Sequence, residues 1–121
     1  MVLISCIATA LDRIEAMDPA VMSLFASPGR SIESTVLPAL VEAAWARNTP
    51  TVLMLDDVHR LTATASLDVI AFVMLHLPPG LRLALTARRV MPLPFARLRV
   101  ADNLLEFEAR DLALDATAVT M

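Results

Sequence analysis

The fold is decided by residues 51–59, which read Thr-Val-Leu-Met-Leu-Asp-Asp-Val-His. Residues 51–55 form an uninterrupted apolar run, the pattern of a strand that is covered on both faces in a parallel sheet. Asp56 and Asp57 follow at once. Ligands of open α/β sheets bind beyond the carboxyl ends of the strands, so two carboxylates are expected where a ligand would bind. An Asp pair here also occurs as a plain helix cap or turn, so this motif alone leaves both interpretations open.

The residues that follow continue an α/β pattern. Strand, helix, strand, connector and strand in this order predict a doubly wound or right-handed sheet with parallel strands. Pro and Gly punctuate the segments and set their ends. The expected elements are a helix over 64–77, a strand over 81–86, one or two helical turns over 95–99, a third strand over 104–108 and the start of a helix from Asp115.

The first 50 residues are helical by pattern. Apolar spacing predicts a helix over residues 2–15, although residues 3–8 are rich in β-branched side chains and a strand there stays an open alternative. Asp18-Pro19 is a helix start, with Asp as N-cap and Pro at the first helical position. A third helix is expected over 31–47, where Pro38 must cause a kink or mark a second start.

Composition limits the protein classes that fit. The chain has 121 residues, the size of one domain, and 57% of them are hydrophobic. The net charge is −3 and all ten basic residues are Arg, spread without a basic stripe, so direct nucleic-acid binding is not expected. Cys6 is the single cysteine, so the sequence cannot form an internal disulfide, as suits the reducing cytoplasm. We expect Cys6 to be a small buried hydrophobe. The apolar stretch 2–11 is too short to anchor the chain in a membrane.

The end of the second strand strengthens the binding interpretation. Thr86 and Arg88 would bring a hydroxyl and a guanidinium to the same edge of the sheet as the two acids. In a domain that hydrolyses nucleotides, Asp56 would hold Mg²⁺ and Asp57 would orient or deprotonate the attacking water. Arg88 and Thr86 could then sense a γ-phosphate.

Five short segments carry a resemblance to a known family. They are residues 52–59, 76–81 (His-Leu-Pro-Pro-Gly-Leu), 86–88 (Thr-Ala-Arg), 93–99 and 104–107. In this order they resemble the ATPase domain of STAND-type regulators, specifically the MalT-like group of large LuxR-type bacterial transcription activators. The resemblance implies an incomplete parallel, three-layer α/β sheet of P-loop NTPase (AAA/NB-ARC-like) type, with about three strands and flanking helices.

The resemblance also implies roles for single residues. Asp56 and Asp57 look like the Walker B acids, with Asp56 on the metal and Asp57 catalytic. His59 resembles the histidine that follows those acids, although a surface turn residue is an equal interpretation. Arg88 resembles the sensor-1 arginine, with Thr86 beside the nucleotide. The cofactors implied for the intact family are ATP and Mg²⁺.

The phosphate-binding part of that family is missing from this sequence. A P-loop needs a Gly-rich turn followed by Lys and Ser or Thr, and this sequence contains no Lys. Gly29 is the only glycine before the acids, and no strand precedes it. We therefore expect one partial ATPase domain over 1–121, inactive alone and binding neither cofactor by itself. Its expected parts are a helical lead-in over 1–50, a Walker B to sensor-1 region over 51–112 and a truncated helix over 113–121.

Three functions remain open at this stage. The chain is the core of a truncated or split ATPase, a non-catalytic module that binds a full-length relative or itself, or a genomic remnant without a selected role. The resemblance implies a P-loop strand between the two strands expected over 51–55 and 81–86. Without that strand, either these two pair directly or residues 2–8 fill the gap. Exposed sheet edges then predict association with a protein partner or with a second copy, and poor solubility.

Overall fold

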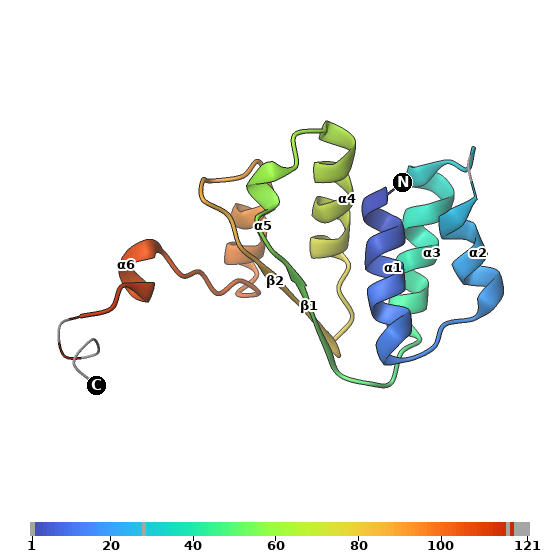
Figure 1. Ribbon diagram of the computed structural model, residues 1–121, viewed down its shortest axis with the longest axis horizontal. Coiled ribbons are helices and arrows are strands. Elements are labelled where there is room, and N and C mark those ends of the chain that lie inside the picture. The colour runs from blue at the N-terminus through green and yellow to red at the C-terminus, as the bar shows by residue number, and fades with distance from the viewer. Residues whose placement is uncertain (1, 28, 116, 118–121) are drawn as a thin grey trace.

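The computed structural model describes residues 2–27, 29–115 and 117. A helical group, α1 to α3, lies on one side of a pair of strands, and an arm leaves the body toward the C-terminus (Figure 1). The elements are α1 (Val2–Ile14), α2 (Pro19–Ala26), a π-helical turn η1 (Ile32–Val36), α3 (Leu37–Trp45), β1 (Thr51–Leu55), a 3-10 turn η2 (Val58–Arg60), α4 (Thr64–Leu75), β2 (Leu81–Leu85), α5 (Phe95–Val100) and α6 (Ala109–Leu112). The helix expected from Asp115 falls largely on residues 116 and 118–121, outside the described residues.

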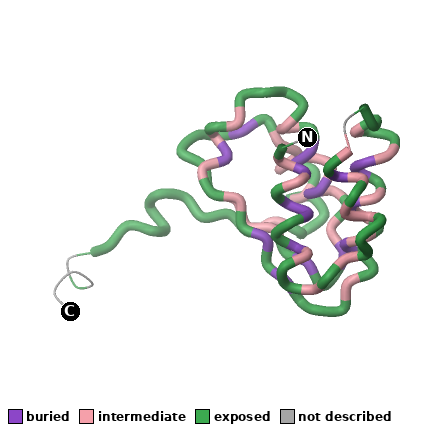
Figure 2. Tube along the Cα trace, turned by 45° about the vertical axis from the view of Figure 1, so that its right-hand side comes forward, coloured by how far each residue is buried: buried purple, intermediate pink, exposed green. Residues whose placement is uncertain are grey.

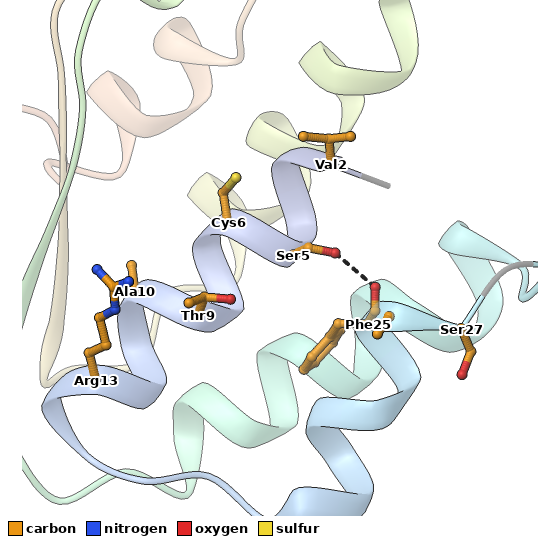
Figure 3. A pocket seen from close by; sticks show the side chains of 9 residues that line it. Val2, Ser5, Cys6, Thr9, Ala10, Arg13, Phe25 and Ser27 are labelled. Atoms are coloured by element: carbon orange, nitrogen blue, oxygen red, sulfur yellow. Dashed lines mark hydrogen bonds between the residues drawn. The ribbon is translucent and has the colours of Figure 1, made fainter.

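Residues 3–8 lie within helix α1, so the strand interpretation of this segment is wrong. Its buried stripe follows helical spacing and packs against the helices α2 and α3 and the strands. Cys6 lies off this stripe and is exposed, so its expected burial is also wrong (Figure 3). The stripe consists of Ile4, Ile7, Ala8 and Leu11.

The starts of α2 and α3 follow from their local sequence. The Asp18 carboxylate accepts a 2.8 Å hydrogen bond from the Ala20 backbone N–H, as expected for an N-cap. Before Pro38 the helix widens, and the Val36 N–H donates to the Ser31 carbonyl oxygen five residues back, at 3.1 Å. Helix α3 then begins with Pro38 in its first turn. A proline ring crowds the carbonyl four residues before it, and the widened turn accommodates that crowding.

The sheet of the described residues has two strands, β1 and β2, which pair in parallel. They pair directly, from Thr51 opposite Leu81 to Leu55 opposite Leu85, with no segment between them. The third strand expected over 104–108 is wrong: this stretch forms no strand and has none beside it among the described residues. It belongs to the arm, which leaves the body instead of packing along the sheet (Figure 1). A strand needs a neighbour, and the described residues supply none.

One face of this sheet is covered and the other is open. Leu53 and Leu81 are buried beneath α1 and α4 in the main core. On the other face, Val52 is 60% exposed and Met54 is 65% exposed. The expectation that β1 is covered on both faces, as in a three-layer sheet, is therefore wrong for the described residues.

A second, smaller core lies under the carboxyl ends of the strands. It is built from one residue of η2, two of α4 and one of the connector after β2, with α5 packed against it. This core fixes the loop after β1 onto α4. Its buried members are Val58, Ile70, Met74 and Met91.

Polar contacts of Arg47, which follows α3, and of Trp45, the last residue of α3, hold the helical group on the rest of the structure. The Arg47 side chain is 5% exposed and donates hydrogen bonds to the carbonyl oxygens of Leu11 at 2.9 Å and Glu15 at 3.0 Å. The same guanidinium reaches the Thr51 hydroxyl at 3.4 Å, so it joins α1 to the first residue of β1. The Leu11 oxygen also accepts the Glu15 backbone N–H at 3.2 Å, so Arg47 adds a second donor at the C-terminal end of α1.

Trp45 forms the second link. Its indole N–H donates to the backbone oxygen of His76 at 3.1 Å, and the imidazole of His76 stacks on Phe72 with ring centroids 4.2 Å apart. This contact joins the end of α3 to the end of α4.

None of the helices in the described part of the chain is long and apolar enough to cross a membrane.

Candidate functional site

The loop after β1 reverses direction at Asp57. Its backbone has φ 55° and ψ 45°, the left-handed region, which Asp enters more readily than most residues. This conformation turns the chain into η2 and buries Val58, which is 3% exposed. The Val58 N–H donates to the Thr86 carbonyl oxygen at 2.9 Å. The position of both acids is therefore fixed by the end of the neighbouring strand.

Thr86 is the centre of this arrangement. Its hydroxyl donates a hydrogen bond to Oδ1 of Asp56, and its Oγ1 accepts the Asp57 backbone N–H at 2.8 Å. Its own backbone N–H donates to the Leu55 carbonyl oxygen at 3.0 Å. Three contacts thus tie the carboxyl ends of β1 and β2 together, and one oxygen of Asp56 is oriented by the hydroxyl.

His59 links the two loops from the other side. The Arg88 backbone N–H donates to Nδ1 of His59 at 3.2 Å, so the imidazole carries its proton on Nε2 when this bond forms. The Arg89 guanidinium donates to the His59 carbonyl oxygen at 3.1 Å. The sequence analysis did not predict that Arg89 takes part in this contact. The one sequence feature that could have indicated it is that Arg89 directly follows Arg88. The Arg88 guanidinium is exposed and makes no hydrogen bond or ion pair within the described residues.

The structure therefore brings all five expected site residues to one edge of the sheet. They come from two loops, one after each strand, and the parallel pairing of β1 with β2 places the loops side by side. Their roles in binding or catalysis remain predictions. The five are Asp56, Asp57, His59, Thr86 and Arg88.

An open hollow of about 440 Å³ adjoins the acids. It is lined by the loop and end of β1, by Arg60 of η2 and by Leu3 of α1. A Mg²⁺ ion typically takes one or two carboxylates and keeps several waters, so Asp56 and Asp57 fit part of such a site. Within the described residues no group of three or more His, Cys, Asp or Glu side chains gathers to form a closed metal cage.

The phosphate side of a nucleotide site has less support in this chain. Gly80 precedes β2 at the amino end of the sheet, where its carbonyl oxygen accepts the Thr51 N–H at 2.9 Å. Gly29, with φ 81°, lies in the turn between α2 and η1. Neither glycine is at the edge that carries Asp56. Arginine side chains are therefore the positive groups that this edge offers to an anion.

A separate groove of about 600 Å³ runs along α1 and the end of α2 (Figure 3). It is lined mainly by apolar atoms, with the Ser5 hydroxyl bonded to the Phe25 carbonyl oxygen at 2.8 Å. Cys6 and Arg13 also line it, and no acidic or imidazole side chain does. This groove is distinct from the carboxylate edge and none of the expected site residues reaches it.

Comparison with known proteins gives one consistent relationship. The chain is 38% identical over 66 residues to the HTH-type transcriptional regulator MalT of Yersinia enterocolitica, 39% over 64 residues to that of Serratia proteamaculans, and 34% over 84 residues to that of Cronobacter sakazakii. These matches cover 54%, 53% and 69% of this chain. This partial homology supports a MalT-like relationship.

The chain spans a small part of those relatives. The matched residues are 7%, 7% and 9% of the three MalT proteins. No protein-family model matches the sequence.

Proposed function

We propose that this chain is a segment of a MalT-like, ATP-dependent transcriptional regulator, and that it supplies the metal side of a Mg²⁺–ATP site. The phosphate cradle comes from a polypeptide segment outside this sequence, because the sequence has no Lys and no glycine at the carboxylate edge. Alone, the chain does not turn over ATP. The observation that carries the proposal is the joint positioning of Asp56 and Asp57 by Thr86.

Each side chain has a defined task in this proposal. Bound Mg²⁺ would supply charge neutralisation for the phosphate oxygens. Asp56 holds the metal, and the Thr86 hydroxyl keeps its carboxylate in one orientation. Asp57 follows the metal ligand directly in the sequence and orients the attacking water. Arg88 has an unpaired guanidinium to offer a γ-phosphate, and His59 holds the backbone of that residue in place.

The first test uses the purified chain with Mg²⁺ and ATP. Phosphate release is expected at the background rate, with binding too weak to saturate at micromolar ATP. Most phosphate contacts of such sites come from the missing loop. Saturable, stoichiometric ATP binding at micromolar levels that Asp56→Ala leaves unchanged would contradict the assignment of the acids.

The second test supplies the missing loop. Residues 51–112 of this chain replace the aligned segment of the Yersinia MalT regulator, and ATP binding and turnover are measured with and without Mg²⁺. Asp56→Asn is expected to remove the Mg²⁺ dependence of binding, and Asp57→Asn to abolish turnover while binding stays. Asp68→Asn on the exposed surface of α4 is the matched control and leaves both unchanged. Equal turnover in all three variants would refute the proposal.

A second candidate function is a non-catalytic interaction module that associates with a full-length regulator or with itself. It is favoured by the open sheet face, where Val52 and Met54 are exposed, and by the two unpaired strand edges. Size-exclusion chromatography with light scattering tests it. We expect self-association that the double variant Val52→Lys, Met54→Lys abolishes and that Val100→Lys, at a position 90% exposed, does not. A clean monomer at high concentration, with one sharp unfolding transition, would count against this candidate.

A further inference from the structure

The groove of about 600 Å³ along α1 and the end of α2 has a surface that the proposed function does not use (Figure 3). Its α1 wall is the exposed face of that helix, where Val2 is 79% exposed. Most of the lining is apolar, and among the described residues that line it Arg13 alone is charged. The α1 residues of the lining are Val2, Ser5, Cys6, Thr9, Ala10 and Arg13.

The arm is a second exposed apolar surface, and its charge has the opposite sign. Every residue from 105 to 114 is exposed, and no residue of α6 is buried. Phe107, Leu112 and Leu114 are 65%, 70% and 76% exposed. The same ten residues contain three acids and one arginine, so the segment is net negative. Large apolar side chains gathered in one short exposed segment indicate a contact surface.

The arm and the groove lie on opposite sides of the β1–β2 pair. Figures 1 and 2 show the arm leaving the body on the side away from the helical group α1 to α3. The Arg99 guanidinium anchors the start of the arm to α5 through two hydrogen bonds to the Glu106 carboxylate, at 3.1 and 2.7 Å. A contact between the arm and the groove therefore joins two molecules, the arm of one and the groove of the other.

The charges of the two surfaces are complementary. Within the described residues the Arg13 guanidinium has neither an ion pair nor a hydrogen bond. On the arm, Glu108 pairs with Arg110 at 3.0 Å, and these side chains are 67% and 81% exposed. An ion pair this exposed contributes little stability, so the Glu108 carboxylate exchanges partners at little cost.

The lengths of the two surfaces also agree. From Val2 to Arg13 the groove follows α1 for about 16 Å. The arm from Phe107 to Leu114 spans about 18 Å when the residues on either side of α6 are extended. If the acidic start of the arm lies at Arg13, the end of the arm lies over the first turns of α1. The charges thus favour an arm that runs antiparallel to α1.

We infer that residues 105–114 of one copy of this chain dock in the α1 groove of a second copy, antiparallel to α1 and with Glu108 beside Arg13. Docking removes the apolar side chains of the arm from water and gives Arg13 a carboxylate partner. The two surfaces differ, so the contact is heterologous and each copy offers one of each. A short arm in one groove buries less than the roughly 1,000 Å² of a stable interface, so the contact is weak.

This contact is independent of the nucleotide proposal and of the open sheet face. Neither Val52 nor Met54 lines the groove, and no residue of the carboxylate edge does. All tests therefore use the chain with Val52→Lys and Met54→Lys, in which contact through the sheet face is blocked. Size-exclusion chromatography separates partners this weakly bound, so the tests trap the contact or observe it at equilibrium.

The first test traps the contact at Cys6, the single cysteine of the chain. Ala113→Cys puts a second thiol near the end of the arm, and diamide serves as the oxidant. We expect a disulfide between Cys6 and position 113 of another copy, identified by mass spectrometry, and a ladder of dimers, trimers and longer species. Ala101→Cys, at an exposed alanine before the arm, is the matched control and is expected to react with Cys6 at least about tenfold more slowly.

The second test separates the two surfaces. Ala10→Glu puts an acid in the groove and Leu112→Glu puts one on the arm, and each is expected to raise the dissociation constant at least about tenfold. The concentration dependence of the arm's amide NMR signals measures it. Ala16→Glu and Val100→Glu, exposed and outside both surfaces, are the matched controls and leave it unchanged. Mixing the Ala10→Glu and Leu112→Glu proteins restores docking, because the first keeps a normal arm and the second a normal groove.

The charge contact has its own pair of variants. Arg13→Glu puts a like charge beside Glu108 and is expected to weaken docking at least about tenfold. Arg97→Glu, exposed on α5 outside both surfaces, leaves docking unchanged. Far-ultraviolet circular dichroism checks that each variant is folded, as the exposure of the substituted positions leads us to expect.

Several results would overturn the inference. A mixture of Ala10→Glu and Leu112→Glu that stays monomeric would show that the arm and the groove are not partners. Disulfides that join only two copies of Cys6, or only two copies of position 113, would show a symmetric contact of another kind. Docking of Ala10→Glu at full strength would place the arm elsewhere. None of these tests contains nucleotide, so their failure leaves the ATP proposal to its own experiments.

Discussion

The Asp57 backbone N–H donates a 2.8 Å hydrogen bond to the side-chain oxygen of Thr86. The same hydroxyl donates to Asp56, so one side chain at the end of β2 holds both acids at the end of β1. We expect Thr86→Val to lower the free energy of unfolding by about 1 kcal/mol, because both hydrogen bonds are lost while water can still reach the freed groups. Thr86→Ser keeps the hydroxyl and most of the stability. Urea unfolding of the three proteins measures the difference, and equal midpoints for Val and Ser would show that the hydroxyl is irrelevant.

The left-handed backbone of Asp57 predicts an unusual order of stabilities. Glycine adopts φ 55° without steric cost, whereas alanine does not. Asp57→Ala is therefore expected to lower the unfolding free energy by about 1 kcal/mol, and Asp57→Gly to leave it within about 0.5 kcal/mol of the wild-type value. Asp102, with φ 57°, provides an internal comparison and should give the same order. Thermal unfolding by circular dichroism measures both series. A more stable Ala variant at both positions would contradict the explanation.

Arg47 is expected to be the most sensitive arginine of the chain. Arg47→Met removes the buried guanidinium that donates to the carbonyl oxygens of Leu11 and Glu15, and the Leu11 oxygen keeps only the Glu15 backbone N–H. We expect a loss of about 2–4 kcal/mol of unfolding free energy, measured by denaturant titration. Arg13→Met, an exposed position in the last turn of α1, is the control and should change stability by less than about 0.5 kcal/mol. Similar losses for the two variants would show that general helix charge, and not capping, is responsible.

The anchor of the arm should weaken in acid. Hydrogen bonds from Arg99, supported by its positive charge, hold the pKa of Glu106 below its usual range. A carboxylate whose pKa is lower in the folded state stabilises above its unfolded pKa, about 4.3, and this contribution disappears as the pH falls through the folded pKa. NMR titration of the Glu106 side chain measures the pKa directly.

Two arginine variants control that titration. Arg99→Gln is expected to return the pKa of Glu106 to the ordinary range, whereas Arg97→Gln, on the same helix without a contact to Glu106, should leave it depressed. If both variants leave the pKa of Glu106 unchanged, the anchor proposed for the arm does not exist in solution.

The helix starts and the two strands were predictable because their causes are local. Asp18-Pro19 combines an N-cap with a proline at the first position, and both act within one turn. The strand over 51–55 was recognised from its apolar run, and the acids that follow it remain a predicted site. Parallel pairing then brought Thr86 beside Asp56, as the common edge of such strands requires.

Two of the errors concern neighbours that the described residues do not include, and a third concerns helical geometry. Residues 104–108 have the composition of a strand, but a strand forms only where another edge is available. Val52 and Met54 are as apolar as Leu53, so their sequence alone could not reveal that one face of β1 is uncovered. Burial of Cys6 was expected from apolar neighbours in sequence, whereas helical geometry turns it away from the stripe that contains Ile4 and Ile7.

The contact between Trp45 and His76 gives this protein a built-in optical reporter. The chain has one tryptophan and no tyrosine, so its near-ultraviolet fluorescence comes almost wholly from the indole whose N–H bonds to the end of α4. Emission from this single fluorophore follows the docking of α3 against α4, while far-ultraviolet circular dichroism follows the helices themselves. Comparison of the two signals along one unfolding curve separates two events, the detachment of α3 from α4 and the loss of the helices themselves. No added label is needed.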